Sequence, residues 1–337
     1  MKILITGGCG FVGANLCFYL KDKLKIQNLL IDTVDNLKKK TSLINLKRLK
    51  KEGIKNYKLD VSKENSLRKL KKYDLIIDCC AEPAVEVSKK SPNNVLATNL
   101  VGTINTVEKA RKDNSKIIFI SSSRVYPIKK TYKYLSQKKT FDENDNLSGV
   151  KSLYGYSKIS SEMLIEEYSY AFNLDYLIIR SGLITGPWQF GKVEQGLISL
   201  WIIKHIFKQK LSYIGFNGTG KQVRDVLFID DFCELVLISI KKFNSIKNQT
   251  FCIGGGKKNQ VDLRKLTNLC QKVTKNKIKI KRIKKTSIYD IPYFVSKNAK
   301  AKRLLSWKPR TNIKDIITKT YNWINDNKKL IKRYYNE

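Results

Sequence analysis

Tyr154 and Lys158 are separated by three residues, so on a helix their phenol and ammonium groups lie on one face. Such a pair can move a proton to or from a sugar hydroxyl. The spacing alone does not identify a catalytic pair, because several other tyrosines also have a lysine four residues further on. These are Tyr19, Tyr126, Tyr134 and Tyr293. The surrounding sequence has to separate the functional pair from the chance matches.

Three glycines near the start of the chain form a second feature with chemical meaning. Gly7, Gly10 and Gly13 lie in the stretch ITGGCGFVG, directly after an apolar segment typical of a strand. Glycine at these places permits a tight turn, a close approach of the backbone to a pyrophosphate, and close packing of helix on strand. The helix that follows offers N–H groups and the positive end of its dipole to phosphates. The pattern therefore predicts a dinucleotide site.

An acidic residue about 20 residues beyond such a turn binds the ribose hydroxyls of the dinucleotide. Asp32 ends the second predicted strand and is the first candidate. Asp35 is the second candidate, because the DTVDN loop leaves the alignment uncertain by three residues. A carboxylate at this place repels a 2′-phosphate, which favours NAD over NADP, although Lys38–Lys40 weigh against that preference.

The elements that must position these residues alternate through the first half of the chain. Strands are expected at 2–6, 28–32, 56–61, 74–80, 116–123, 176–182 and 250–256, and helices at 11–20, 94–112 and 152–171. Apolar strands that alternate with helices predict an α/β fold, a Rossmann-like doubly wound parallel sheet. Such sheets bind ligands at the carboxyl ends of their strands.

The irregular pattern after about residue 183 predicts a second, smaller lobe. We expect residues 1–182 and about 236–260 to form an NAD-binding Rossmann domain. Residues 183–235 and about 261–330 are expected to form a mostly C-terminal lobe over the carboxyl ends of the strands, where the substrate binds.

The composition excludes several other classes of protein. The chain has 337 residues and is 42% hydrophobic, without an apolar run long enough for a membrane span and without a signal peptide at its start. Seven scattered cysteines without a C-x-x-C pair indicate buried thiols in a reducing cytoplasm, and no metal site. The net charge of +37 comes mostly from dispersed lysines, so we expect no specific nucleic-acid site. His205, the single histidine, is expected to be structural or to lie on the lobe surface.

Five motifs, in their order along the chain, resemble those of the extended short-chain dehydrogenase/reductase family. They are T-G-G-x-G-F-x-G at 6–13, D-V at 60–61, N-x-x-G-T-x-N at 99–105, S-S-S at 121–123 and Y-x-x-x-K at 154–158. None of the other four tyrosine–lysine pairs has this setting. The resemblance implies that Tyr154 and Lys158 are catalytic, and the family's spacing of three residues before Val125 indicates Ser122 as their partner.

In the chemistry that the resemblance implies, Tyr154 takes the proton from a sugar hydroxyl while hydride passes to NAD. Lys158 stabilises the phenolate and binds the nicotinamide ribose, and Ser122 holds the developing carbonyl oxygen. The resemblance also implies the set of residues that contact the cofactor. These are Gly7, Gly10, Phe11, Val12, Gly13, Asp32 or Asp35, Asn36, Asp60, Val61, Cys80, Ala81, Glu82, Asn99, Tyr154 and Lys158.

Two sequence segments in the second half of the chain narrow the choice of substrate. GPWQFGKVEQG (186–196) and GTGKQVRDV (218–226), together with SRVYPI and CAEPAV, resemble the CDP-paratose 2-epimerase (CDP-tyvelose epimerase) group of that family. The forked donors of Arg224 suit a nucleotide diphosphate. The substrate contacts implied by the resemblance are Glu82, Ser122, Ser123, Trp188, Gln189, Gln195 and Arg224.

The residues after Ser122 bear on the reaction. Nucleotide-sugar dehydratases of the family have Asp-Glu there, whereas this chain has Ser123 and Arg124, so elimination of water is not expected. The resemblance favours epimerisation of a CDP-sugar at C2 through a transient 2-keto sugar, in lipopolysaccharide O-antigen biosynthesis. The alternatives are a UDP-hexose 4-epimerase or related redox enzyme, and a binding protein without catalysis. The intact set of Ser122, Tyr154 and Lys158 argues against the last of these.

Two departures from the family pattern bear on the shape of the sugar pocket. Lys297 stands in VSKNAKAK where relatives have an acid, and Phe228 stands where many have histidine. The predicted helices 94–112 and 152–171 suit the four-helix dimer contact that is common in the family. We therefore expect a cytoplasmic homodimer.

Overall fold

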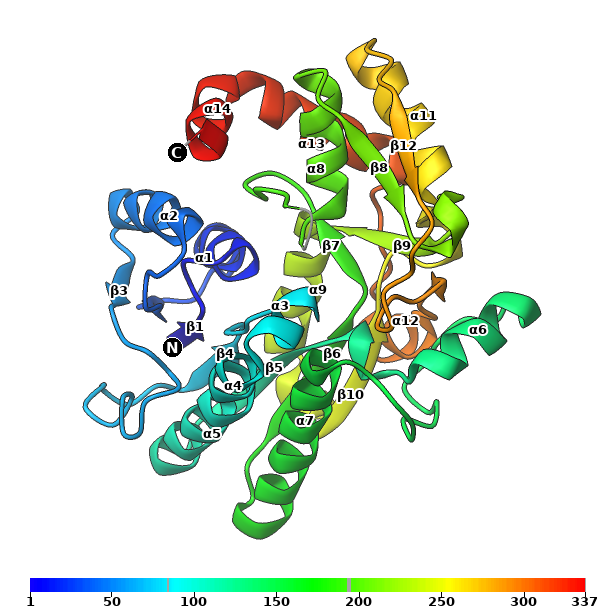
Figure 1. Ribbon diagram of the computed structural model, residues 1–337. Helices are drawn as coiled ribbons and strands as arrows, with labels where there is room; N and C mark the ends of the chain where they lie inside the picture. Colours follow the sequence, from blue (N-terminus) through cyan, green and yellow to red (C-terminus); the bar gives the residue numbers. More distant parts are fainter. Residues whose placement is uncertain (84, 193–194, 337) are drawn as a thin grey trace.

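The computed structural model describes residues 1–83, 85–192 and 195–336 (Figure 1). Within these residues the largest element is a seven-stranded sheet in the order β10-β6-β5-β4-β1-β2-β3, with every neighbouring pair parallel. The strands are β1 (Lys2–Thr6), β2 (Leu30–Val34), β3 (Lys55–Tyr57), β4 (Leu75–Asp78), β5 (Lys116–Ser122), β6 (Tyr176–Ser181) and β10 (Gln249–Ile253). The strand order reverses at β1, which confirms the predicted doubly wound, Rossmann-like α/β fold.

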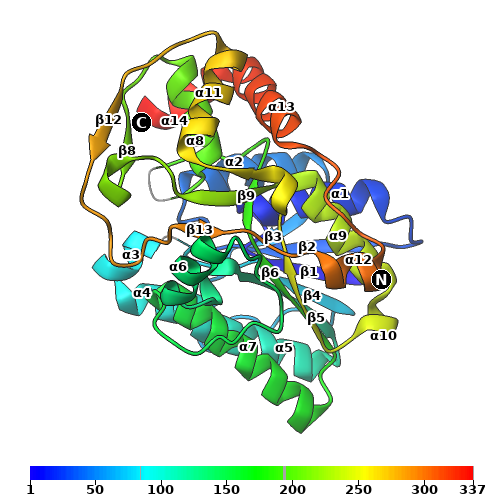
Figure 2. The same ribbon diagram turned by 90° about the vertical axis from the view of Figure 1, so that its right-hand side faces the viewer.

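Helices cover both faces of this sheet. The helices of the described residues, including those of the second part of the molecule described below, are α1 (Phe11–Lys23), α2 (Lys40–Lys51), α3 (Val85–Lys90), α4 (Pro92–Leu96), α5 (Gly102–Asp113), α6 (Ile128–Gln137), α7 (Leu153–Phe172), α8 (Leu197–Ile206), α9 (Ile229–Lys241), α10 (Phe243–Ile246), α11 (Leu263–Thr274), α12 (Ala299–Leu305), α13 (Ile313–Asp326) and α14 (Lys328–Asn336). Figure 2 shows α1 and α9 on one face of the sheet and α5 and α7 on the other.

The alternation of side chains along each strand explains why the strands are apolar throughout. In β1, Ile3 and Ile5 join the core that contains α1 and α9, whereas Leu4 joins the core that contains α5 and α7. Successive side chains of a strand point to opposite faces, so a sheet covered on both faces needs apolar residues at every position.

Several predicted elements differ from those observed. The strand expected at 28–32 is observed at Leu30–Val34, so Asp32 lies within it and not at its end. The helix expected at 94–112 is divided into α4, a π-helical turn (Ala97–Val101) and α5. The strand expected at 56–61 ends at Tyr57. It ends early because Asp60 starts a turn in which its Oδ1 accepts hydrogen bonds from the backbone nitrogen and hydroxyl of Ser62.

Further strands lie beyond the carboxyl ends of the large sheet. They are β7 (Leu183–Thr185), β8 (Leu211–Ile214), β9 (Val223–Phe228), β11 (Gln260–Val261), β12 (Ile280–Ile283) and β13 (Tyr293–Phe294). Strands β7, β9, β11 and β13 form one small sheet, and β8 pairs with β12. Helices α8, α11 and α13 pack together beside them. We call this part of the molecule the lobe.

The predicted domain boundary between residues 235 and 236 falls inside α9. Because α9 packs against α1 and contributes to the core of the large sheet, we propose that the whole helix belongs to the dinucleotide-binding domain. In the described parts of the chain, no helix combines the length and apolar character needed to cross a membrane.

Candidate active site

A cavity of about 1140 Å³ lies between the carboxyl ends of the large sheet and the lobe. Its wall contains the glycine turn, the ends of β2, β4 and β5, and lobe residues from β7 to β13. A site for one small ligand has a volume of about 300–1,000 Å³, so this central cavity has room for more than one. The sequence-predicted site residues are therefore compared with its wall.

The glycine turn forms one end of the central cavity. Gly7 has φ +62°, and a Cβ there would lie 2.9 Å from the Cα of Cys80. A Cβ on Gly13 would lie 2.4 Å from the oxygen of Gly7, so neither position accepts a larger residue without a shift. Helix α1 begins directly afterwards, and no side chain caps its amino end. This cradle fits the diphosphate of a dinucleotide.

The structure separates the two candidate acids for the adenosine ribose. Asp32 is 1% exposed and does not line the central cavity. Its carboxylate accepts a hydrogen bond from the hydroxyl of Tyr73 at 2.8 Å and pairs with Lys71. Asp35 lies in the cavity wall and accepts a hydrogen bond from the backbone nitrogen of Cys9 in the glycine turn. The geometry therefore favours Asp35 over Asp32, the first choice from the sequence, because Asp32 is engaged with Tyr73 and Lys71 away from the cavity wall.

Two of the three lysines that weighed against NAD, Lys38 and Lys39, are already paired with carboxylates. Lys38 Nζ lies 2.8 Å from Asp60 Oδ2, and Lys39 Nζ lies 3.1 Å from Glu82 Oε2. Although burial acts in the opposite direction, hydrogen bonds from Lys38, Ser62 and the Asn36 amide lower the pKa of Asp60. Both lysines therefore have partners other than a 2′-phosphate, which fits NAD.

The segment after β4 continues the wall. Cys80, Ala81 and Glu82 line the central cavity, and burial raises the pKa of the Cys80 thiol well above its ordinary value. Asn99, a predicted cofactor contact, is fully buried and does not line the cavity. Its Oδ1 accepts a hydrogen bond from the backbone nitrogen of Glu82 at 2.7 Å, and its Nδ2 donates to Ser157 at 3.0 Å. Asn99 therefore supports the Glu82 segment of the cavity wall without lining the cavity itself. The remaining predicted cofactor residues, Gly10, Phe11, Val12, Asn36, Asp60 and Val61, line the cavity.

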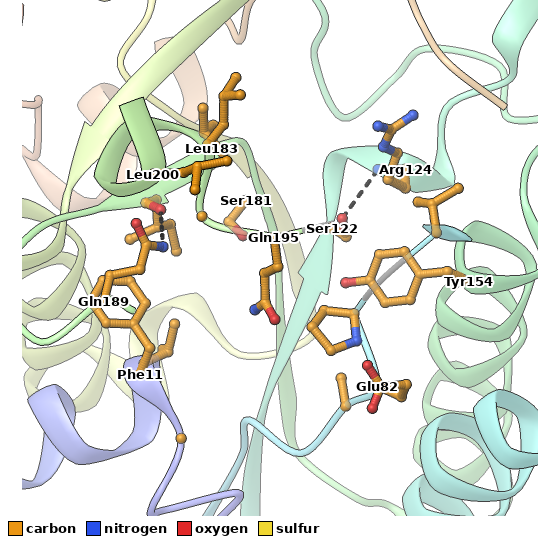
Figure 3. A pocket seen from close by; sticks show the side chains of 18 of the residues that line it. Phe11, Glu82, Ser122, Arg124, Tyr154, Ser181, Leu183, Gln189, Gln195 and Leu200 are labelled. Carbon is orange, nitrogen blue, oxygen red and sulfur yellow. Dashed lines mark hydrogen bonds between the residues drawn. The ribbon is translucent and has the colours of Figure 1, made fainter. Parts of the chain in front are cut away.

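Ser122, Tyr154 and Lys158 line the same part of the central cavity. Ser122 ends β5, and Tyr154 lies in the first turn of α7, where the hydroxyl of Ser152 caps the backbone nitrogen of Gly155. Figure 3 shows the Tyr154 hydroxyl directed into the cavity near Ser122. The other four tyrosines with the same lysine spacing are absent from this wall. The catalytic role of the trio stays a prediction from the sequence.

Lys158 is almost completely buried, one helical turn beyond Tyr154. Its ammonium group donates a hydrogen bond to the oxygen of Ile120 at 2.9 Å and lies 4.4 Å from the centre of the Phe119 ring. Both contacts come from β5, so the strand that carries Ser122 also positions the lysine. The ammonium group of Lys158 is therefore held in one position in the cavity wall.

A buried ion pair behind this trio was not anticipated from the sequence. Arg180 of β6 donates from Nε and Nη2 to Glu162 Oε2 at 2.9 and 2.7 Å, and the hydroxyl of Ser121 donates to Glu162 Oε1. Glu162 lies on α7 one turn beyond Lys158, and it joins that helix to β5 and β6. The available signal was a glutamate on the buried face of a helix together with an arginine inside an apolar strand.

On the lobe side, Arg224 lines the central cavity from β9. Its Nη2 lies 3.4 Å from Asp290 Oδ1 and donates to the oxygen of Ile291 at 2.7 Å. Burial and the nearby positive charge of Arg124 lower the pKa of Arg224 to about 10. Gln195 also extends into the cavity (Figure 3), and Ser123 lies in its wall.

Gln189 borders the central cavity, but its side chain is engaged in the lobe. Its Oε1 accepts hydrogen bonds from the hydroxyls of Thr185 at 2.8 Å and Ser199 at 2.9 Å, and its Nε2 donates to the oxygen of Ile184. It is 7% exposed. The geometry favours a structural role over the substrate contact implied by the resemblance.

Trp188 is likewise held by packing. The guanidinium carbon of Arg48, from α2, lies 3.5 Å from the centre of its ring, and the Trp323 ring of α13 lies 5.1 Å away. Arg48 also donates to Asn45, whose Nδ2 donates to the oxygen of Cys9 in the glycine turn. Trp188 therefore links the lobe to the cofactor side of the central cavity. Two residues of its block, Val193 and Glu194, and Ala84 of CAEPAV lie outside the described residues.

The two departures from the family pattern lie away from the cavity wall. Lys297 pairs with Asp142 at 3.4 Å, and Phe228 is 2% exposed beside Lys319. Neither residue lines the central cavity. His205 is fully buried in α8, as a structural residue would be, and its Nδ1 hydrogen-bonds to the oxygen of Trp201. Among the described residues no cluster of side chains is suited to a metal ion.

Comparisons with known proteins agree with this geometry. A family model for the NAD dependent epimerase/dehydratase family matches residues 3–254. A CDP-paratose 2-epimerase from Salmonella typhi is 29% identical, over 96% of this chain and 99% of that protein. A putative UDP-glucose 4-epimerase from Methanocaldococcus jannaschii is 30% identical, over 96% of this chain and 99% of its own length. The structure of UDP-glucuronic acid 4-epimerase from Bacillus cereus with UDP-glucuronic acid and NAD has a TM-score of 0.81 at 22% identity, covering 97% of this chain and 99% of that one.

Proposed function

Because the chain belongs to the NAD dependent epimerase/dehydratase family, we propose that it interconverts CDP-paratose and CDP-tyvelose at C2 of the sugar. The family and the relatives of full length support NAD-dependent nucleotide-sugar epimerase chemistry, and NAD is the cofactor of the family. One observation carries the proposal. Ser122, Tyr154 and Lys158 meet in a cavity whose wall also contains a glycine cradle and Arg224.

The side chains in the cavity wall opposite the catalytic trio support the proposal that the substrate is a deoxygenated sugar. Leu183 and Leu200 line the central cavity across from Ser122 and Tyr154 (Figure 3). Paratose and tyvelose are 3,6-dideoxyhexoses, so they offer C–H groups where common hexoses offer hydroxyls. Apolar side chains leave a hydroxyl without a hydrogen-bond partner and therefore favour the dideoxy sugar.

In the proposed binding mode, this chain's residues hold the dinucleotide along the carboxyl ends of the strands. The glycine turn holds its diphosphate, Asp35 accepts hydrogen bonds from the adenosine ribose, and Lys158 binds the ribose at the nicotinamide end. When bound, NAD would supply a reversible acceptor for the hydride of the sugar carbon. These contacts follow β1 and β2 and lie on α7. They would keep the cofactor in place between the removal of hydride from the sugar and its return.

Tyr154 and Ser122 act on the C2 oxygen of the sugar. The phenolate of Tyr154, stabilised by the Lys158 ammonium, takes the proton of the C2 hydroxyl. The hydroxyl of Ser122 donates a hydrogen bond to this oxygen as it becomes a ketone. The sugar then presents its other face, and Tyr154 returns the proton. The lobe must hold the nucleotide firmly during this change of face, which is the role proposed for Arg224.

Isotope labelling tests this function directly. The enzyme is incubated in ordinary water with CDP-paratose that carries deuterium at C2, and the product is identified by mass and NMR. We expect CDP-tyvelose that retains the deuterium at C2, since hydride leaves and returns within one site. Loss of the label to solvent, or inertness toward CDP-paratose, would overturn the proposal.

The second candidate is a UDP-hexose 4-epimerase, supported by the 30% identical relative. It uses the same trio with the sugar turned so that C4 faces Tyr154. Conversion of UDP-glucose to UDP-galactose, with no action on CDP-paratose, would establish it in place of the first.

Exposed apolar side chains support the expected homodimer. Tyr156, Met163 and Tyr170 follow one another at intervals of seven on α7, and all are more than half exposed. Val101, which ends the π-helical turn, and Ile104 of α5 are exposed as well. We propose that these faces of α5 and α7 meet their counterparts in a second copy, and light scattering of the purified protein tests this.

A further inference from the structure

Arg124 lies in the turn that directly follows the predicted catalytic serine. Its backbone nitrogen donates a hydrogen bond to Ser122 Oγ at 3.2 Å. On the other side, a Cβ on Gly155 would lie 2.2 Å from the oxygen of Arg124, so the turn and the start of α7 are in direct contact. The position of Arg124 is thereby fixed relative to both Ser122 and Tyr154.

The side chain of Arg124 extends from this turn to the lobe (Figure 3). Its Nη1 donates a hydrogen bond to the oxygen of Tyr289 at 2.9 Å. The next residue, Asp290, pairs with Arg224, and all four side chains line the central cavity. Two guanidinium groups therefore approach the same short segment of the lobe, one from the catalytic turn and one from β9.

Arg124 and Arg224 are close enough for their positive charges to act on each other, and Asp290 supplies one negative charge beside Arg224. The positive charge of Arg124, after burial, is a cause of the lowered pKa of Arg224. A phosphate group between the two would accept hydrogen bonds from both forked guanidinium groups, which suits the planar geometry of arginine. Both guanidinium groups therefore lie where a phosphate in the central cavity could reach them, close to the catalytic trio.

The chemistry of a nucleotide sugar identifies the phosphate. Ser122 and Tyr154 fix the place of the reacting carbon, and the sugar-linked phosphate is attached to C1. C2 is bonded directly to C1, whereas C4 lies on the opposite side of the ring. A cation in the same turn as Ser122 thus fits a substrate that reacts at C2, with its phosphate next to the reacting carbon.

We infer that Arg124 binds the sugar-linked phosphate of the substrate, while Arg224 holds the phosphate next to the nucleoside. This inference rests on the proposed function, because it takes a nucleotide-diphosphate sugar as the ligand. It assigns a binding role to a residue that, from the sequence, served only as evidence against dehydration.

The test compares two ligands that differ only in the phosphate concerned. Calorimetry measures the binding of CDP and CMP to the NAD-loaded wild-type enzyme and to Arg124→Met, since CMP lacks the second phosphate. We expect Arg124→Met to weaken CDP binding by roughly 10- to 100-fold and to leave CMP binding within about twofold. Arg124→Lys keeps the positive charge but loses the forked N–H donors of the guanidinium group. Its affinity for CDP should lie between those of the wild-type enzyme and Arg124→Met.

Arg303 provides the matched control, because it is exposed on α12 and does not line the central cavity. Arg303→Met removes the same charge and should leave both affinities unchanged. Equal weakening of CDP and CMP by Arg124→Met would overturn the inference, and so would an unchanged preference for CDP. Loss of UDP-glucuronate turnover with the CDP preference intact would show that Arg124 binds a sugar carboxylate instead, which also overturns it.

The experiment separates the inference from the proposed function. The ratio of diphosphate to monophosphate affinity does not depend on where the sugar reacts, and UDP and UMP serve equally if they bind more tightly. An enzyme that acts at C4 with an unchanged role for Arg124 would contradict the proposed function alone.

Discussion

On the sheet side of the central cavity, the predicted catalytic side chains are held by neighbouring strands and helix turns, whereas on the lobe side Trp188 and Arg224 are held by segments far along the chain. Lys158 contacts the backbone of β5, and the helix that carries Tyr154 is capped by Ser152. Trp188, by contrast, packs between α2 and α13. Changes on the sheet side should therefore affect the chemistry, and changes on the lobe side should affect stability and fit.

The largest effect is expected for the phenol on the sheet side. Tyr154→Phe should lower kcat by at least about 100-fold, because general acid–base catalysis contributes roughly 10²- to 10⁴-fold. The ring is retained, so the NAD content of the purified protein should not change. Steady-state kinetics and the released dinucleotide measure the two quantities. Tyr19→Phe, which has the same lysine spacing, is the control, and near-normal activity in Tyr154→Phe would contradict the assignment.

The buried ion pair behind the trio should give the next largest effect. Glu162→Gln leaves the Arg180 charge buried without its partner and should lower the free energy of unfolding by about 3 kcal/mol. Glu108→Gln breaks a more exposed pair with Arg111 and should cost less than about 1 kcal/mol. Urea denaturation compares the two. Equal losses would mean that the buried pair does not stabilise the sheet side.

Two glutamines sharpen the comparison within the lobe. Gln189→Leu removes buried hydrogen bonds with Thr185 and Ser199 and should cost about 1–3 kcal/mol of unfolding free energy. Gln195→Ala should change stability by less than about 0.5 kcal/mol and instead raise the KM of the sugar nucleotide. The reverse pattern, measured by denaturation and kinetics, would return Gln189 to the substrate contacts.

The smallest effect concerns pH and the single histidine of the chain. Burial lowers the pKa of His205 below its ordinary value of 6.5. The unfolded state then binds the proton more readily, so stability present above about pH 6.5 should be lost as the pH falls, by at most about 1.4 kcal/mol per unit. His205→Gln should remove this slope between pH 5.5 and 7.5, as thermal unfolding can measure. An unchanged slope would assign it to carboxylates.

Local sequence patterns predicted well which residues line the sheet side of the central cavity. The glycine turn, the serine after β5 and the tyrosine at the start of α7 each follow from a strand, a turn and a helix that adjoin in sequence. Asp32 shows the limit of this reasoning. The strand predicted to end at Asp32 runs on to Val34, so Asp32 lies in the middle of β2, and its side chain meets Tyr73, more than 40 residues away, instead of lining the cavity.

The lobe side was less predictable because long-range packing decides it. The resemblance indicated Trp188 and Gln189 as substrate contacts, but residues of α2, α8 and α13 occupy their side chains. Asn99 and Glu162 act from behind the wall, where a motif cannot distinguish a supporting residue from a contact. The proximity of Arg124 to Arg224 depends on the segment at 289–290, which has no recognisable pattern in the sequence.

The stacking of Trp188 has a consequence for spectroscopy. Of the four tryptophans, Trp201 and Trp307 are 3% and 1% exposed in the interior, whereas Trp188 stacks on the charged group of Arg48 beside Trp323. A cation on an indole face shifts and quenches its emission. Any movement of the lobe relative to α2 would change this contact. The emission of Trp188 is therefore a dye-free probe of the contact between the lobe and α2.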